Sequence, residues 1–483
     1  MPASAEFPPS FLGPWTERLR AHIHQRADDW PSYYCASNPE SLITTGIPRA
    51  LYVGTGVSIF TRALLPAILN AKHSVHFVTC YWAPSPSLDS FRETLEKLAE
   101  ARLETPDAPP LKITIGFSSR GLLQKLLHTS SPDGYVYPPS RWAKLGLPDE
   151  SVLKNAGIDM TVKSLFFTPF SVMHPKYLIV DGAKAWVPSC NVSWERWFEG
   201  CVEVEGEIVR QMLAFHDSVW GSQGIDASPF GVRNSSPSTL QVAAQSKRAS
   251  LHSGGLGLSA TQSLKFSTTS PVPAIFLPSP HHRNPRFSFF PFLSQSDPPM
   301  TPLNAALLTL FENAQRNISV VTPNVTSWPA LEALLQALAK GIDVEIRTSR
   351  SMMVMEQLVT AGTTTSWSLD RFIKKYKALV NSKPNANDPE APALGVGRLD
   401  ILYYKPLQSR EAEEDEPVLS HFKMTMVDDE YLVLGSGNLD RASWWTSQEI
   451  GLLFHVPDFE GRHLWEGVLE RRTEYLFRSA DLY

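Results

Sequence analysis

Two stretches of eighteen residues decide the fold of this chain: HPKYLIVDGAKAWVPSCN at 174–191 and HFKMTMVDDEYLVLGSGN at 421–438. They share residue types at five key positions, and each matching pair is 247 residues apart. The pairs are His174 and His421, Lys176 and Lys423, Asp181 and Asp428, Ser189 and Ser436, and Asn191 and Asn438. At about 1 in 20 per residue type, five fixed matches arise by chance about 3 × 10⁻⁷ times per starting position. The repeat therefore indicates a duplicated unit.

Each copy is typical of a β-hairpin that presents polar groups on one face. A His and a Lys two residues apart on a strand point to the same side. Asp181-Gly182 is a strong signal for a two-residue turn, which predicts that His174 lies opposite Ser189. The same turn in the second copy predicts that His421 lies opposite Ser436. We expect each unit to project an imidazole, an ammonium, a hydroxyl and a carboxamide toward one spot.

The sequence around each hairpin repeats one order of helices and strands. Each unit starts with an apolar helix and a buried strand, and continues with an amphipathic helix and a second apolar strand. The expected first helices are 58–71 and 303–314, the first strands 75–80 and 318–322, and the second strands 112–116 and 343–347. Alternating helices and strands predict an α/β fold of two similar halves, with sheets flanked by helices.

A biased segment separates the two halves. The expected divisions are an N-terminal extension with a helix at 1–49, a first half at 50–220, a disordered Ser/Pro-rich linker at 221–300 and a second half at 301–483. The linker is rich in Ser, Pro, Gly and Thr, a composition typical of disorder. It contains two apolar patches, at 274–277 and 287–293. We favour docking of these patches on the body over insertion into a bilayer surface, and we expect the linker to be dispensable for the fold.

Composition limits the setting of the chain. The formal net charge is −5 over 483 residues, and the chain has no long basic tail. The overall charge therefore does not attract nucleic acid or anionic membranes. Four cysteines without a CxxC pair indicate neither a disulfide framework nor a metal motif. We find no signal peptide and no transmembrane segment. The expected location is intracellular, either cytoplasmic or peripheral to a membrane.

The repeated groups suit a phosphodiester. Lys and Asn donate hydrogen bonds to non-bridging oxygens and stabilise the charge that develops there. An imidazole of near-neutral pKa serves as nucleophile or general acid. One half offers a single His, whereas double displacement with acid assistance needs two, so we expect the halves to share one active site across a pseudo-twofold axis. A metal site is disfavoured, because each His has a Lys beside it. We therefore expect no cofactor and metal-independent activity.

The chain resembles the phospholipase D superfamily, whose signature is a duplicated HxKxxxxD motif followed by a GSxN element. The arrangement is closest to cardiolipin-synthase-like members, and the only departure is Pro188 where Gly is usual. The tyrosyl-DNA phosphodiesterase branch of the superfamily lacks the motif Asp, so the presence of Asp181 and Asp428 argues against that branch. The resemblance implies the phospholipase D fold, with mixed sheets and one shared site. It implies these catalytic residues: His174, Lys176, Asp181, His421, Lys423 and Asp428. It implies these substrate-binding residues: Ser189, Asn191, Ser436 and Asn438.

The same resemblance implies a mechanism. His174 would be the nucleophile that forms a phosphohistidine, and His421 would protonate the leaving alcohol. The family carries an acidic residue after each Asn that supports a His, and Glu203 and Glu449 fit this role. Glu199 and Glu205 compete with Glu203.

Three functions stay open. The first is a phosphodiesterase or phosphatidyltransferase acting on phospholipids, as a monomer with peripheral membrane contact. The second is a nuclease of the same superfamily, which the acidic net charge disfavours. The third is a non-catalytic scaffold, which the complete side-chain sets of both motifs disfavour. Five aromatic residues follow the two Asn positions. They form either the entrance of a binding site for acyl chains or, as we favour, part of the hydrophobic core. They are Trp194, Trp197, Phe198, Trp444 and Trp445.

Overall fold

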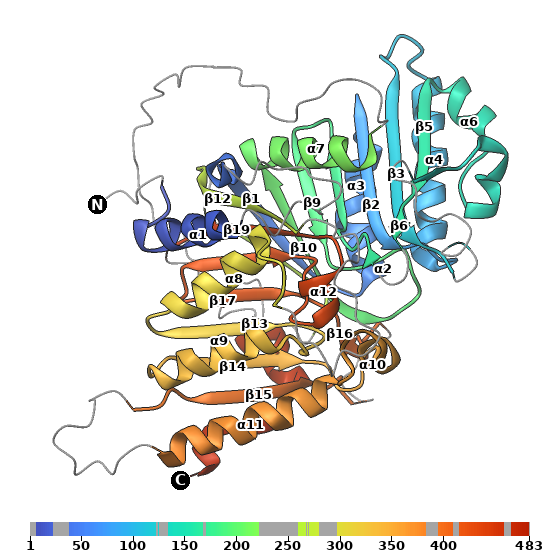
Figure 1. The fold of residues 1–483 in the computed structure, drawn as a ribbon. Helices are drawn as coiled ribbons and strands as arrows, with labels where there is room; N and C mark the ends of the chain where they lie inside the picture. The colour runs from blue at the N-terminus through green and yellow to red at the C-terminus, as the bar shows by residue number, and fades with distance from the viewer. Residues whose placement is uncertain are drawn as a thin grey trace.

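The structure is a computed structural model that describes residues 6–22, 38–121, 124, 134–167, 171–221, 259–266, 268, 270–279, 297–382, 395–408, 415–457 and 465–482. Helices pack around a large mixed sheet that runs through both halves (Figure 1). The N-terminal extension carries α1 (Pro9–Ala21), and the helices of the first half are α2 (Gly56–Ile59), α3 (Leu65–Leu69), α4 (Pro86–Leu103), α6 (Glu150–Asn155) and α7 (Glu207–Trp220). Those of the second half are α8 (Pro302–Asn313), α9 (Trp328–Ala339), α10 (Val354–Ala361), α11 (Thr365–Ser382) and α12 (Arg441–Trp445). No helix in the described part of the chain is long and apolar enough to cross a membrane.

The two halves use the same strand order. In the first half the order is β5 (Ile158–Ser164), β3 (Leu111–Ser119), β2 (Ser74–Tyr81), β8 (Tyr177–Val180), β9 (Lys184–Pro188), β10 (Trp197–Glu205) and β1 (Ile43–Gly54). In the second half it is β15 (Leu399–Tyr404), β14 (Asp343–Thr348), β13 (Asn317–Val321), β17 (Met424–Val427), β18 (Tyr431–Gly435), β19 (Glu449–His455) and β12 (Val272–Ser279). In each half the first three strands are parallel and the rest antiparallel. The expected α/β fold of two similar halves is confirmed.

Smaller strands extend this sheet at its margins. β20 (Thr473–Arg478) pairs with β15, and β4 (Tyr135–Val136) pairs with β5. β11 (Gln262–Lys265) adds to β1, and β16 (Leu419–Ser420) pairs in parallel with the start of β10. β6 (Phe166–Phe167) and β7 (Ser171–Val172) form a separate small ribbon.

The centre of the molecule is a pair of strands, β1 and β12. Ile43 of β1 lies opposite Ile275 of β12, and the far edge of β12 pairs with β19. Ala274–Leu277 are 2% exposed or less, because helices and sheet cover them from both sides. The prediction that 221–300 is a disordered linker is therefore wrong for β11 and β12. Short apolar runs in a Ser/Pro-rich context are easily misread, since β12 finds its partners only in distant strands. The second apolar patch, 287–293, lies outside the described residues.

The hairpin registers also differ from the prediction. Val180 pairs with Lys184, and Val427 pairs with Tyr431, so each turn has three residues instead of two. Asp181 and Asp428 both adopt positive φ, at 54° and 56°, a conformation that Asp tolerates better than most residues. The shift of one residue means that neither Ser lies directly opposite its His.

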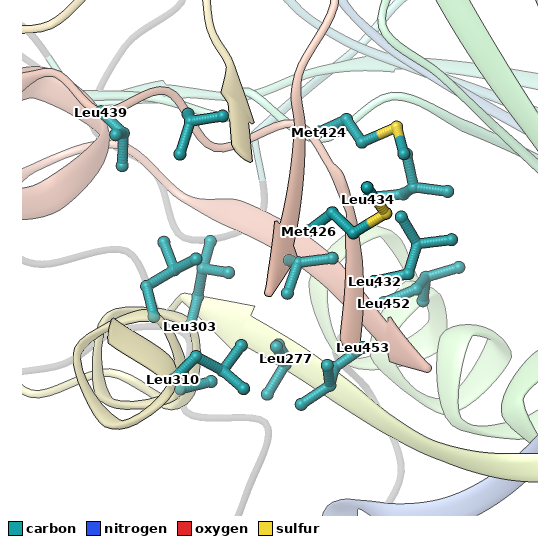
Figure 2. Close-up of a cluster of buried hydrophobic side chains, with 14 of the residues drawn as sticks. Leu277, Leu303, Leu310, Met424, Met426, Leu432, Leu434, Leu439, Leu452 and Leu453 are labelled. Carbon is teal, nitrogen blue, oxygen red and sulfur yellow. The ribbon is translucent and has the colours of Figure 1, made fainter. Parts of the chain in front are cut away.

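The core of the second half lies between its helices and the sheet. Figure 2 shows leucine and methionine side chains from α8, β12, β17, β18 and β19 packed together. Helix α8 begins sharply because Thr301 accepts a hydrogen bond from the Asn304 N–H at 3.1 Å and Pro302 occupies the first turn. Helix α1 docks on α8, where the Trp15 indole donates to the Pro302 carbonyl at 3.3 Å. The N-terminal extension is thus tied to the second half.

Candidate active site

The two His-x-Lys pairs lie where the halves meet. His174 and Lys176 directly precede β8, and His421 and Lys423 directly precede β17. The backbone of each His is held by the opposite half: the His174 N–H donates to Gln448 at 3.0 Å, and the His421 N–H donates to Phe198 at 2.8 Å. The short parallel pairing of β16 with β10 adds to this contact. The sequence-predicted pairs are therefore brought together at one place.

Each imidazole contacts a glutamate from the other half. His174 Nδ1 lies 2.8 Å from Glu449 Oε2. His421 Nδ1 lies 2.9 Å from Glu199 Oε1 and 3.1 Å from Oε2. An ionised carboxylate only accepts hydrogen bonds, so it holds the proton on Nδ1 and leaves Nε2 with a lone pair. Glu449 was expected to support a histidine, and the structure places it there, across the interface between the halves.

The Glu203 prediction is wrong, because the neighbouring Glu199 makes the contact. Glu203 instead accepts from the Tyr52 hydroxyl at 3.0 Å. Both glutamates lie on β10 an even number of residues apart, and so on the same face, but Glu203 is about 13 Å further along the strand. The equivalence of Glu199 and Glu449 is visible only in the structure: Gly200 N donates to Ser189 as Ile450 N donates to Ser436, and each Glu immediately precedes that donor.

The two serines lie behind these glutamates. Ser189 Oγ donates to Glu199, and Ser436 Oγ donates to Glu449 Oε2 at 2.5 Å. Ser443 of α12 also donates to Glu449, at 2.7 Å. Ser189 and Ser436 are buried, at 2% and 0% exposed. The serines therefore hold the two glutamates in place and do not face the substrate. This corrects the substrate-facing position that the two-residue turn predicted.

The two lysines differ in what they contact. Lys176 Nζ donates to the carbonyl of His174 at 2.9 Å. Lys423 Nζ donates to the carbonyl of His421 at 2.7 Å and also lies 2.8 Å from His421 Nε2. Consequently His421 Nε2 already has a partner. The His174 side chain is also more accessible, at 14% exposed against 3% for His421.

Burial sets the charges at the site. It lowers the pKa of His174 and, together with Lys423, holds the pKa of His421 well below its ordinary value, so both rings are neutral near pH 7. Burial raises the pKa of Glu199 to about 7 and lowers the pKa of Lys423 to about 7. Burial is the largest influence on Glu449 and acts to raise its pKa, but the contacts with His174 and Ser436 and the nearby Lys176 together keep this pKa below its ordinary value. The Glu449 carboxylate therefore stays negatively charged near pH 7, whereas the Glu199 carboxyl group can gain or lose a proton near that pH.

The two asparagines are held at the rim of the same region. Asn191 Oδ1 accepts from the Tyr81 N–H at 3.2 Å. Asn438 Nδ2 donates to Asp440 at 2.9 Å, and Asp440 in turn caps α12 by accepting from the Ser443 N–H at 2.8 Å. Their expected contact with phosphate oxygens stays a prediction.

Asp181 and Asp428 lie away from the imidazoles, at the far ends of their hairpins. Asp181 accepts from the backbone N–H groups of residues 72–74, at 2.7 to 3.2 Å. Asp428 accepts from those of residues 315–317, at 2.7 to 3.1 Å. Partial burial acts to raise the pKa of Asp181, but the backbone donors hold it below its ordinary value. The expected catalytic role of both aspartates is therefore corrected: they anchor each hairpin to the loop before its neighbouring strand.

The aromatic residues after the asparagines divide into two groups. Phe198, Trp444 and Trp445 are buried in the core. Trp197 lies against the His421 ring, with centroids 4.9 Å apart, and Trp194 is 56% exposed. The core interpretation holds for three of the five residues.

The donor set does not resemble a metal centre. Within the described ranges, no group of three or more His, Cys, Asp or Glu residues is arranged to hold a metal ion. Lys423 Nζ also occupies the position beside His421 Nε2 that a cation would take.

Comparison with known proteins fits this geometry. Residues 307–463 match the family described as "Cardiolipin synthase, PLD-like domain". No curated protein matches the chain in sequence. Phosphatidylserine synthase of Haemophilus influenzae Rd KW20 has a similar structure, with a TM-score of 0.54, 14% identity, and coverage of 97% of this chain and 93% of that one. That likeness shows a shared fold.

Two further solved structures show weaker similarity. Polyphosphate kinase from Porphyromonas gingivalis has a TM-score of 0.43 and 10% identity, with coverage of 89% of this chain and 49% of that one. The phospholipase D family member Nuc from Salmonella typhimurium has a TM-score of 0.24 and 15% identity, with coverage of 36% of this chain and 89% of that one. The resemblance predicted from the duplicated motif is confirmed: residues 307–463 match a cardiolipin synthase, PLD-like domain, and the chain as a whole shares its fold with the phosphatidylserine synthase.

Proposed function

We propose that this protein is a phosphodiesterase or phosphatidyltransferase that acts on phospholipids through a phosphohistidine intermediate. The observation that carries the proposal is the pair of His–Glu contacts that cross between the halves. They bring two imidazoles and two lysines into one buried site and hold the proton of each ring on Nδ1, which leaves the His174 Nε2 lone pair that a nucleophile needs.

In the first step His174 Nε2 attacks the phosphorus, and the bond from phosphorus to the leaving alcohol oxygen breaks. The alcohol takes a proton from His421 Nε2. The accessibility of His174 and the occupied Nε2 of His421 favour this assignment over the reverse. Because His421 Nε2 carries a lone pair in the resting site, it first receives this proton from Lys423 Nζ, 2.8 Å away, and Lys423 is left neutral. The Lys423 pKa of about 7 allows this donation near neutrality.

In the second step His421 removes a proton from the incoming water or alcohol, whose oxygen then attacks phosphorus. The phosphorus–nitrogen bond to His174 breaks, and neutral His174 is restored. Lys176 stabilises the negative charge on the non-bridging oxygens in both steps. The proton that His421 holds after the second step returns to Lys423 Nζ, which restores the starting charges. Water as the acceptor gives hydrolysis, and an alcohol or a second lipid gives phosphatidyl transfer.

The lipid substrate is supported by the names of two relatives, cardiolipin synthase for the family and phosphatidylserine synthase for the similar fold. Both names belong to enzymes that make phospholipids. The nuclease alternative is disfavoured by the net charge of −5, since nucleic-acid affinity rests on neutralising many phosphates.

The test is a parallel incubation of the purified protein with phosphatidylcholine, phosphatidylglycerol and single-stranded DNA, in EDTA. We expect turnover of a phospholipid, and a ³²P label on the protein when the lipid phosphate is labelled. His174→Ala should lose both. Cleavage of DNA without lipid turnover would assign the nuclease function instead, and a requirement for added Mg²⁺ or Zn²⁺ would contradict the metal-independent mechanism.

A further inference from the structure

A tryptophan lies against the second of the two histidines. Trp197 is the first residue of β10, and the centroid of its ring is 4.9 Å from that of the His421 imidazole, with 45° between the ring planes. Glu199, two residues further along β10, contacts Nδ1 of the same imidazole at 2.9 Å. Residues two apart on a strand point to the same face, so one short stretch of β10 makes both contacts.

The backbone holds this stretch of β10 against the chain that carries His421. The start of β10 pairs in parallel with β16, which ends directly before His421. The His421 N–H then donates to the Phe198 carbonyl at 2.8 Å. Figure 1 shows β10 and β16 where the two halves meet. The contact between the two rings is therefore fixed from both sides by main-chain bonds.

A serine takes the equivalent position beside the first histidine. The His174 N–H donates to the Gln448 carbonyl at 3.0 Å, and Gln448 pairs in parallel with the residue that directly precedes His174. Gln448 therefore corresponds to Phe198, and the residue before it, Ser447, corresponds to Trp197. A serine side chain has no π system. The two halves thus differ in a residue that contacts the ring in one of them.

An indole beside an imidazole has its largest effect when the imidazole is charged. The face of an indole is partly negative and attracts a cation within about 6 Å of its centroid, more strongly where water is excluded. The His421 side chain is 3% exposed, so water screens this attraction only slightly. The neutral ring gains much less from the same contact. Trp197 therefore favours the protonated form of His421 over the neutral form.

The other groups around His421 mostly oppose its protonation. Burial is the largest influence that lowers the pKa of His421, and three nearby groups add to it: Lys423, Lys176 and His174. Glu199 provides the opposing negative charge, but burial raises its own pKa to about 7, so the carboxyl group is only partly ionised near neutrality. The attraction from Trp197 does not depend on the protonation of any neighbour.

We propose that Trp197 is a positioning residue that stabilises the imidazolium form of His421, and so makes His421 the proton donor and leaves His174 as the nucleophile. This role rests on the proposed function, because the charged ring is a species of that reaction. In the first step the proton moves from Lys423 Nζ to His421 Nε2 and then to the leaving alcohol, so His421 is charged between the two transfers. In the second step His421 is charged again after it takes a proton from the incoming water or alcohol.

The test replaces Trp197 with Phe, which keeps a π face, and with Leu, which keeps only apolar bulk. Single-turnover release of the leaving group is measured from two phosphatidyl esters, one of an alkyl alcohol and one of p-nitrophenol. We expect Trp197→Leu to slow release of the alkyl alcohol about fivefold to thirtyfold, the factor that a shielded cation–π contact supplies. Trp197→Phe should slow it less. Neither variant should slow release of p-nitrophenol, which needs no proton.

The matched control is Trp367→Leu, on α11, where the tryptophan is 61% exposed. This variant should change neither rate. Circular dichroism and thermal unfolding check that all three variants are folded. Equal slowing with both esters, or equal rates in Trp197→Phe and Trp197→Leu, would overturn the proposal, because Trp197 would then act through packing alone.

A second readout does not depend on turnover. NMR of the histidine rings, assigned with His421→Ala, follows the protonation of His421 in the resting protein. The midpoint of this titration should be lower in Trp197→Leu than in the unmodified protein, by about half a pH unit or more. A lower midpoint in a protein that turns over no phosphodiester would overturn the proposed function alone. An unchanged midpoint would overturn the role of Trp197, whatever the substrate.

Discussion

His174 and His421 occupy equivalent positions in the two halves, yet their Nε2 atoms face different surroundings. His421 Nε2 has Lys423 Nζ at 2.8 Å, while His174 is the more exposed of the two and its nearby lysine donates to its backbone instead. A near-symmetric sequence thus produces an asymmetric site. This asymmetry fits a nucleophile on one side and a proton donor on the other.

We predict that replacing the two histidines affects different steps of the reaction. His174→Ala should abolish both the covalent label and turnover, because the nucleophile is gone. His421→Ala should still be labelled by a substrate with a p-nitrophenol leaving group, which needs no proton, but should hydrolyse the adduct slowly. Stopped-flow release of p-nitrophenol and peptide mapping of the label check this. A label that maps to His421 would reverse the assignment.

A second prediction concerns pH. Burial lowers the pKa of Lys423 to about 7 and the Glu199 carboxylate opposes this shift, so the ammonium is present below about pH 7 and lost above it. We expect kcat/KM to fall on the alkaline side with a pKa near 7. Glu199→Gln removes the opposing charge and should move this limb to lower pH, in addition to slowing turnover. Glu203→Gln, on the same strand, is the control and should leave the limb in place.

The sequence revealed most of the site residues but not all of their roles. The constant spacing of 247 identified both His-x-Lys pairs because those hairpins have equal length. The spacing fails after the asparagines, where Glu199 follows Asn191 by eight residues and Glu449 follows Asn438 by eleven. Helix α12 lies in the longer connection. The correct glutamate could therefore not be found by counting alone, since the choice depends on a helix that one half has and the other lacks.

At the scale of single elements, the two hairpins depend on an aspartate at each turn. Asp181→Ala should lower the free energy of unfolding by about 1 to 2 kcal/mol, because three backbone N–H groups lose their acceptor while remaining partly solvated. Turnover per folded molecule should hardly change. Urea unfolding and active-site titration together measure both quantities, and a loss of kcat at unchanged stability would restore the catalytic role.

The same aspartate makes stability depend on pH. Its pKa in the folded protein lies below the ordinary value near 4. The stabilising contribution is therefore fully present above about pH 4 and is lost as the pH falls through the lower, folded pKa. Asp181→Ala should remove this part of the acid destabilisation.

Strand β12 is predicted to be essential to the fold. Phe276 is 2% exposed and packs edge-on against Phe215, with ring centroids 5.6 Å apart. Phe276→Ala should cost about 3 to 5 kcal/mol. Val272→Ala, at the partly exposed start of the same strand, should cost much less. Equal small effects on urea unfolding for both variants would mean that β12 contributes little to stability.

Element types in the patterned regions followed from the sequence, whereas β12 did not. The strands at 74–81 and 317–321 are rich in β-branched and aromatic residues and each follows an apolar helix, so their period and order were recognisable. β12 has one Pro inside and another near its end, and it lies in a Ser/Pro-rich segment. Only its partners β1 and β19, at least 170 residues away on each side, make it a strand.

At the scale of the whole molecule, the two halves are interlocked through their active site. Each glutamate serves the histidine of the opposite half, and each histidine backbone is bonded to the opposite half as well. Neither half therefore contains a complete acid–base pair.

This interlocking gives a prediction that separates it from two independent sites. Glu449→Gln lies in the second half but contacts His174 of the first, so it should slow formation of the covalent label with every leaving group. Glu199→Gln lies in the first half but contacts His421 of the second, so it should slow turnover mainly for alkyl leaving groups and be largely rescued by p-nitrophenol. If the effect of each glutamate followed its own half, the leaving-group dependence would be exchanged between the two variants. Measuring the label and the turnover of both substrates for both variants therefore decides whether catalysis depends on contacts across the centre of the molecule.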